Sequence, residues 1–149
     1  MPIPSLTAAG LLPAGIHHAT LHEVEVAFGS QTEARSRLYA GLEAFLEWVK
    51  TFQLFTSIVI DGSFVTDKPD PGDIDAVLIL PAPQLKRLMH RPDYAELANT
   101  KVKKRFFIDL FIEPDLDGMA KFFQQLKVED ALERGLPARS LRGVLQVML

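Results

Sequence analysis

The sequence predicts an α/β (α+β) protein, in which a mixed β-sheet is covered by flanking helices. Two observations support this class. In some segments apolar residues recur every three or four positions, as in helices that bury one face, whereas other segments are short β-branched runs bounded by glycine or proline. The two kinds of segment follow one another along the chain, an order that favours helices packed on a shared sheet. A chain of 149 residues, 48% of them hydrophobic, suits a single domain over residues 1–149.

Two helices are expected before the first of these strands. Thr20 and Glu23 form the signature of a capping box, and the apolar residues that follow at helical spacing stop at Gly29. The second helix spans about residues 32–52, where apolar side chains recur at spacings of three and four with charged residues between them. This long amphipathic pattern predicts a helix with one buried face.

Three strands are expected in the middle of the chain. Residues 55–60 are β-branched and aromatic, too few for a helix, and predict a buried strand. A loop rich in proline and aspartate at 66–72 separates this strand from a second one at 73–80. The basic run 101–105 then leads into a third strand at 106–112.

Three further elements complete the expected fold. Residues 84–98 are mixed but helical in pattern, with a break at Pro92, and residues 115–132 predict another helix. The tail 143–149 alternates like a strand. The oligomeric state stays open, although the apolar residues 144–149 could pair with another chain at a sheet edge.

Charge and composition narrow the classes of function. With 19 acidic and 16 basic residues the net charge is −3, which argues against a basic body that binds nucleic acid nonspecifically. The absence of cysteine excludes disulfides and thiolate metal sites. No apolar run approaches the roughly 20 residues that span a bilayer, and residues 1–13 lack the basic start of an export signal. We therefore expect no membrane contact, and cytoplasm is the default location.

Three aspartates carry the strongest chemical signal. Asp73 and Asp75 lie two apart on a predicted strand, so both carboxylates point to one face. Asp109 is at the centre of the third predicted strand among apolar residues, where an unpaired carboxylate is destabilising. If the two strands are neighbours, the three carboxylates converge, and Mg²⁺ would offset their repulsion. We predict that all three bind metal and act in catalysis, with two Mg²⁺ bridging a phosphoryl group.

A turn that faces phosphate is expected where the first strand ends. Gly62 lets the backbone approach a ligand, and Ser63 adds a hydroxyl donor. Lys68 lies in the loop between this turn and the aspartates, from which its ammonium could reach a phosphate. A Gly-Ser pair by itself marks many ordinary turns. The order of strand, Gly-Ser turn, loop and paired aspartates is far more specific than its parts.

Structural interpretations of the same residues stay open. Asp73 could close a Pro-Gly turn while Asp75 points to solvent, and Asp109 could pair with Arg105 as a structural acid. The run 101–105 could neutralise a triphosphate or contact RNA, although charge runs of this kind are usually solvated. Lys68 could likewise be an ordinary loop lysine that is solvated.

The Gly-Ser pair at 62–63, followed by Gly-Asp-Ile-Asp-Ala-Val-Leu at 72–78, resembles the signature of the nucleotidyltransferase superfamily, which has the polymerase-β-like fold. The resemblance covers about residues 55–112. It implies that Ser63 contacts a nucleoside triphosphate (NTP) such as ATP, that Asp73 and Asp75 bind Mg²⁺, and that Asp109 binds metal or acts as general base.

The chain also departs from the pattern of that superfamily. Residues 64–67 read Phe-Val-Thr-Asp, where many members carry arginine or alanine and a further glycine. A long second domain for an acceptor is absent, so the chain is similar to small stand-alone bacterial nucleotidyltransferases, some of which belong to toxin–antitoxin systems. This likeness implies a cognate toxin or antitoxin as a partner.

The leading hypothesis is an enzyme that moves a nucleoside monophosphate from an NTP to a hydroxyl of a protein or an RNA, tRNA being one candidate. Two alternatives stay open. The first is a noncatalytic nucleotide-binding or antitoxin-like partner protein with the same fold. The second is a small metal-dependent phosphohydrolase, which would release phosphate or nucleotide without tagging an acceptor.

Overall fold

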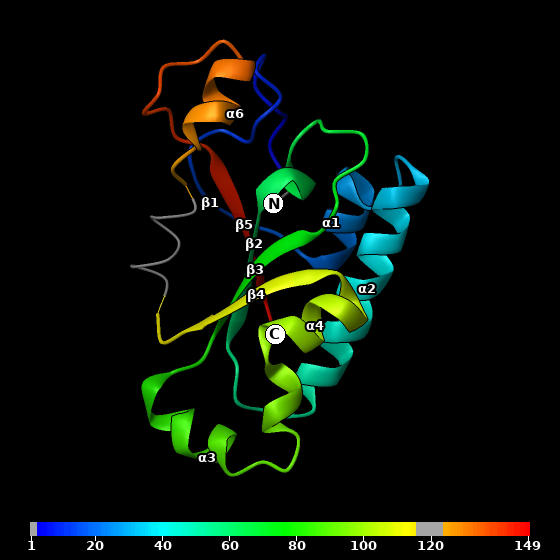
Figure 1. The fold of residues 1–149 in the computed structure, drawn as a ribbon, viewed down its shortest axis with the longest axis vertical. Coiled ribbons are helices and arrows are strands. Elements are labelled where there is room, and N and C mark those ends of the chain that lie inside the picture. Colours follow the sequence, from blue (N-terminus) through cyan, green and yellow to red (C-terminus); the bar gives the residue numbers. More distant parts are fainter. Residues whose placement is uncertain (1–2, 116–123) are drawn as a thin grey trace.

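A single mixed sheet organises the chain in the computed structural model, which describes residues 3–115 and 124–149 (Figure 1). Its strands lie in the order β1-β5-β2-β3-β4. Their bounds are β1 (Gly15–His18), β2 (Ser57–Asp61), β3 (Ile74–Ile79), β4 (Ile108–Glu113) and β5 (Gly143–Met148). The central strand β2 is antiparallel to both neighbours, whereas β3 and β4 are parallel, as are β1 and β5. The predicted α+β class is confirmed.

Helices cover one face of this sheet. The α-helices are α1 (Leu21–Phe28), α2 (Glu33–Lys50), α3 (Leu85–Met89), α4 (Asn99–Phe106) and α6 (Val128–Glu133). Figure 1 shows α1, α2 and α4 on the same side of the sheet, with α3 and α6 near opposite ends of the long axis. Among residues 3–115 and 124–149, no helix is long and apolar enough to cross a membrane.

The period of two along the strands separates the two faces of the sheet. Side chains at alternate positions join the buried cores of α1, α2 and α4 in the main cluster, to which the sheet contributes Ile58, Ile60, Ile74, Ala76, Leu78, Ile108, Leu110, Leu145 and Val147. The intervening positions form a smaller buried cluster on the other face, made by Val59, Val77, Ile79 and Val144. The aspartates of the predicted site share this second face.

The first two helices begin where the sequence predicts. Thr20 and Glu23 make both hydrogen bonds of the capping box, and α1 is followed by Gly29. Thr32 caps α2 by accepting a hydrogen bond from the Arg35 N–H. The helix predicted over residues 32–52 is therefore confirmed to within two residues at its end.

The segment before β4 corrects a prediction. The basic run 101–105 lies inside α4 and does not lead directly into a strand, because Val102 and Phe106 recur at helical spacing and are both buried. Phe107 then ends the helix in the left-handed region, with φ of 62°. The strand accordingly begins at Ile108, two residues later than predicted.

The helix predicted over residues 115–132 is shorter in the structure. Of the helix predicted over residues 115–132, residues 116–123 lie outside the described part, and residues 124–127 are not helical. The backbone there pairs with the segment before β5, through hydrogen bonds from Leu126 N–H to Ser140 O and from Arg142 N–H to Gln124 O. Helix α6 therefore begins only at Val128.

The tail 143–149 does form a strand, but it is not at an edge of the sheet. β5 lies between β1 and β2 and pairs with both (Figure 1, red). Its backbone groups are engaged within the chain, so the predicted pairing of this strand with another chain is wrong. The edge on this side of the sheet is formed by β1, a four-residue strand with two histidines whose short pattern did not predict a strand.

The segment predicted to be helical at 84–98 is divided, as the proline at its centre suggests. A 3₁₀ turn, Ala82–Gln84, leads into α3, and a second one, Tyr94–Leu97, follows Pro92. The expected break near this proline is confirmed.

The close approach of α2 and α4 gives a test of this packing. A Cβ atom added at Gly41 would lie 2.3 Å from the carbonyl oxygen of Phe106, a backbone atom that cannot move aside. We expect Gly41→Ala to lower the free energy of unfolding by about 1–3 kcal/mol, although alanine is the better helix former. Chemical denaturation measures the change.

Gly72→Ala is the matched control for this substitution. No atom lies within 4 Å of a Cβ added at Gly72, which does not need a positive φ. This variant should stay within roughly 0.5 kcal/mol of the parent. Equal stability of the two variants would show that α2 and α4 are not packed so closely.

Candidate active site

Three aspartates lie side by side across the three neighbouring strands β2, β3 and β4. Asp61 is the register partner of Asp75, and Asp75 is the register partner of Asp109. Residues directly opposite one another on paired strands point to the same face of the sheet. Asp73 precedes Asp75 by two residues and ends up on the same side. We call these four residues the acidic row.

The carboxylate of Asp61 is the most buried member of the acidic row. Its residue is 1% exposed, and the Nε atom of Arg142 lies 3.2 Å from its Oδ1 as an ion pair. Burial raises the pKa of Asp61 to about 6, against the opposing effect of Arg142. Arg142, just before β5, therefore brings a compensating charge from the far end of the chain.

Asp75 occupies the centre of the acidic row and is half-buried. Burial, followed by repulsion from Asp73 and Asp109, raises the pKa of Asp75 to about 6. An aspartate in this environment favours a bound proton or cation, because either would relieve the repulsion between neighbouring carboxylates. A divalent ion would therefore relieve the most repulsion if it bound at the centre of the acidic row.

The carboxylate of Asp109 is oriented by a side chain from α4. The Nδ2 atom of Asn99 donates to Asp109 Oδ1 at 2.7 Å, while Asn99 Oδ1 accepts from the Leu110 N–H at 2.8 Å. The backbone contact fixes which way the amide points. One oxygen of Asp109 is therefore held by Asn99 in a defined direction.

The basic residues of the run 101–105 contact different partners. Lys103 Nζ lies 3.2 Å from Asp73 Oδ2, and hydrogen bonding and attraction to Asp73, followed by attraction to Asp109, raise the pKa of Lys103. Lys101 pairs with Glu96 instead. Arg105 lies over the rings of Trp48 and Phe106, so its contacts do not support the structural pairing with Asp109.

Gly62 follows Asp61 directly and has φ of +80°. A Cβ atom at this position would lie 2.0 Å from Asp75 Oδ2, so only glycine lets that carboxylate lie against the turn. Ser63 is half-buried in the 3₁₀ turn Gly62–Val65, where its carbonyl oxygen accepts hydrogen bonds from Thr66. The predicted Gly-Ser turn and the aspartates are therefore in contact.

The loop beyond this turn is held by a buried arginine from α2. Arg35 is 3% exposed, and its guanidinium donates to the carbonyl oxygens of Phe28, Phe64, Thr66 and Lys68. It also lies over the rings of Phe28 and Phe64. The loop from β2 to β3 is thereby fixed to the helical layer.

Lys68 is not brought to the acidic row by any described contact. Its residue is exposed, and its carbonyl oxygen is the group that Arg35 holds. On the other side of the loop, Arg134 donates to Asp67 Oδ1 at 2.9 Å. The structure thus gives Lys68 a backbone role in shaping the loop, and the predicted phosphate contact of its ammonium remains a prediction.

Four residues at this site were not predicted as site residues from the sequence: Asp61, Asn99, Lys103 and Arg142. A carboxylate at the end of an apolar strand, immediately before Gly62, was an available signal for Asp61. The other three depend on side-chain contacts between different elements of the fold. Lys103 was noticed only as a member of the basic run.

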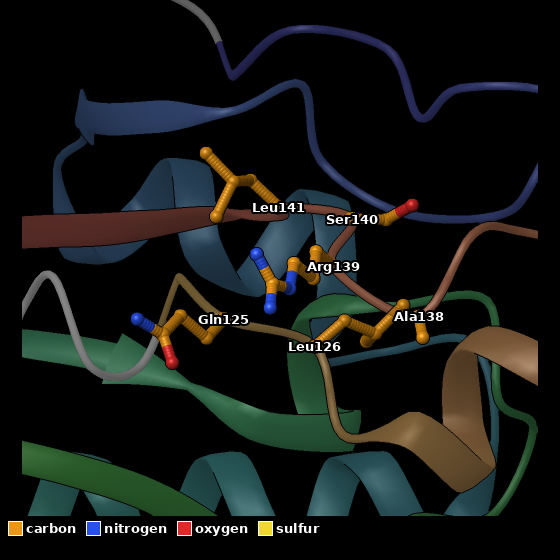
Figure 2. Close-up of a pocket in the computed structure, with 6 residues that line it drawn as sticks. All are labelled: Gln125, Leu126, Ala138, Arg139, Ser140 and Leu141. Atoms are coloured by element: carbon orange, nitrogen blue, oxygen red, sulfur yellow. The ribbon is translucent and has the colours of Figure 1, made fainter.

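A separate cavity of about 360 Å³ lies beside the segment that precedes β5. The residues that line it are Gln125, Leu126, Ala138, Arg139, Ser140 and Leu141. Figure 2 shows the Arg139 side chain extending into the space between Gln125 and Leu141. None of the aspartates of the acidic row lines this cavity, so it is distinct from the candidate site.

The donor set of the acidic row fits Mg²⁺, which prefers carboxylate oxygens and is typically bound by one or two of them. Within residues 3–115 and 124–149, however, no group of three or more acidic or histidine side chains is arranged to hold a metal as it stands. Asp73 is paired with Lys103, and Asp109 is bonded to Asn99. A metal would have to compete with Lys103 for Asp73.

Fold and site together define an α+β protein with a mixed five-stranded sheet and a row of carboxylates beside a Gly-Ser turn. The chain belongs to a family of unknown function, DUF6932, whose sequence model matches residues 4–146. No curated protein and no solved structure matches the chain.

The buried arginine provides a test of how the loop is held. Arg35→Met removes the donors of four carbonyl oxygens, and we expect the free energy of unfolding to fall by about 3 kcal/mol. Arg37→Met is the matched control on the same helix, since Arg37 is exposed and its guanidinium lies 5.5 Å from the Phe107 ring. It should lose less than about 1 kcal/mol. Similar urea midpoints for the two variants would contradict the role of Arg35.

Proposed function

We propose that the protein is a Mg²⁺-dependent nucleotidyltransferase. It moves a nucleoside monophosphate from an NTP, with ATP as one candidate, to a hydroxyl of a protein or RNA and releases pyrophosphate. The observation that supports this best is the pairing register that puts Asp61, Asp75 and Asp109 next to one another. The chain turns at Gly62 directly after the first of them, with Asp75 packed against that turn.

In this proposal Asp73 and Asp75 bind Mg²⁺, and Asp109 either binds metal or takes the proton of the acceptor hydroxyl. When bound, the metal would polarise the α-phosphate and neutralise charge that develops on the transferring group. Asn99 keeps Asp109 in one orientation through its hydrogen bond. Asp61 and Arg142 form the buried edge of the site.

The Gly-Ser turn would hold the triphosphate. Glycine at position 62 lets the turn lie directly against the Asp75 carboxylate, and the Ser63 hydroxyl would add a donor to phosphate beside it. The buried guanidinium of Arg35 fixes the backbone from Phe64 to Lys68. A turn that does not need to rearrange would bind phosphate with less loss of conformational entropy.

The wider setting belongs to the same proposal. In the cytoplasm the protein would meet both NTPs and Mg²⁺, and a place in a toxin–antitoxin system would follow from the resemblance of its motif to nucleotidyltransferases of such systems. The partner would then be a cognate toxin or antitoxin, and the acceptor a protein or an RNA such as tRNA.

Loss of the paired aspartates is the direct test of the proposal. We expect an Asp73→Ala, Asp75→Ala double variant to lose Mg²⁺ binding and to reduce NTP turnover roughly a hundredfold or more, because two proposed ligands are gone. Asp70→Asn is the control, as Asp70 is an exposed loop residue of the same charge. Unchanged turnover in the double variant would remove the proposal.

Labelled nucleotides separate the proposal from its alternatives. The protein is incubated with each α-labelled NTP, Mg²⁺ and cell lysate, and a labelled protein or RNA is the expected product. NTP binding without any labelled product would favour a noncatalytic nucleotide-binding or antitoxin-like protein. Release of free nucleotide without a labelled acceptor would favour a phosphohydrolase.

The orientation of Asp109 can be tested without touching a proposed ligand. Asn99→Ala removes the donor at 2.7 Å from Asp109 Oδ1. We expect Mg²⁺ affinity to fall about tenfold, since a group that orients a ligand typically contributes this much. Isothermal titration calorimetry measures it, with Thr100→Ala as the control at the neighbouring exposed position. Equal affinities for both variants would show that Asn99 does not position the carboxylate.

A further inference from the structure

Lys103 is the member of the basic run 101–105 that contacts the acidic row. Its Nζ atom lies 3.2 Å from Asp73 Oδ2, and the side chain is 53% exposed. Its neighbours in the run have other surroundings, because Lys101 pairs with Glu96 and Arg105 lies over aromatic rings. The contact with Asp73 is therefore a property of this one position and not of the basic run as a whole.

The position of Lys103 on α4 is well defined. Asn99 and Lys103 are four residues apart, so their side chains share one side of the helix, and they reach Asp109 and Asp73 respectively. Val102 and Phe106 anchor the same helix in the core. The helix thus presents an amide and an ammonium to the acidic row from a fixed distance, while the lysine stem stays flexible.

The ammonium of Lys103 and a metal ion would need the same carboxylate. An ion pair this exposed is weak, so a divalent cation at Asp73 and Asp75 would displace the lysine readily. The displaced ammonium would remain beside the site because α4 does not move with it. A Mg²⁺-bound polyphosphate would bring new negative charge to that place, and an ammonium is a good point-charge ligand for phosphate.

We infer that Lys103 is a phosphate-binding residue of this site, which rests on Asp73 in the absence of metal and contacts the polyphosphate when Mg²⁺ occupies that carboxylate. The inference deepens the proposed function, since it uses the same metal ligands and the same triphosphate. It requires no covalent step. In this inference Lys103 competes with the free metal for Asp73, and it strengthens the binding of the metal–phosphate complex.

The two roles predict opposite changes in two binding affinities of a single variant. In Lys103→Met, Mg²⁺ alone should bind roughly two- to fivefold more tightly, because its competitor is gone. Inorganic tripolyphosphate with saturating Mg²⁺ should bind about tenfold more weakly, because a phosphate contact is lost. Calorimetry measures both, and tripolyphosphate needs no knowledge of the preferred base. A lysine that only stabilised the fold would weaken both ligands.

Lys104→Met is the matched control, because it makes the same charge change at the next, exposed position of α4. Both affinities should stay close to those of the parent. Thermal unfolding of the two variants checks that each is folded.

The outcomes separate this inference from the proposed function. If the parent binds both ligands and Lys103→Met binds them equally well, the inference is wrong and the proposed site stands. If the variant behaves as expected and no nucleotide is transferred, Lys103 binds phosphate in a noncatalytic site. If the parent binds neither Mg²⁺ nor tripolyphosphate, the proposed metal site and the inference both fail.

Discussion

The pairing register of β2, β3 and β4 is the constraint on which the candidate site depends. It places Asp61, Asp75 and Asp109 next to one another, an arrangement that like charges oppose by roughly 0.2–1 kcal/mol per directly opposed pair. The same register buries the isoleucines and leucines of the main cluster against the helices, and each such side chain contributes about 1.5–3 kcal/mol. A slip of one residue would expose that whole face. Apolar burial therefore outweighs the repulsion and fixes the carboxylates together.

The remaining repulsion is reduced by groups that reach the acidic row from other elements of the fold. Arg142 approaches Asp61 from the start of β5, whereas Lys103 and Asn99 approach Asp73 and Asp109 from α4. Burial raises the pKa values of Asp61 and Asp75 to about 6, and repulsion between the carboxylates adds to this effect, so the nearby cations compensate it only in part. A concentration of partly compensated carboxylates is a common mark of a functional site, since it lowers stability unless a ligand is bound.

The loop between β2 and β3 shows how the helical layer shapes the site. Arg35 has no carboxylate partner among its described hydrogen bonds and is satisfied by four backbone carbonyl oxygens. Such bonds hold the path of the chain regardless of which side chains the loop carries. The Gly-Ser turn and the aspartates that follow it can therefore keep their relative position while residues 67–70 lie exposed.

Three features were determined by the sequence alone: the capping box at Thr20, the long helix α2, and the shared face of Asp73 and Asp75. Each depends on a short-range pattern, since helical and strand periods are local properties of the chain. Asp109 could be singled out because a carboxylate within an apolar strand is locally anomalous. Only the tertiary structure decided that β5 is interior, that β1 forms the edge, and that Asp61 joins the acidic row. Strand order and register depend on contacts between residues far apart in the chain, such as Arg142 and Asp61, 81 positions apart (142 − 61). No local period encodes such a pairing.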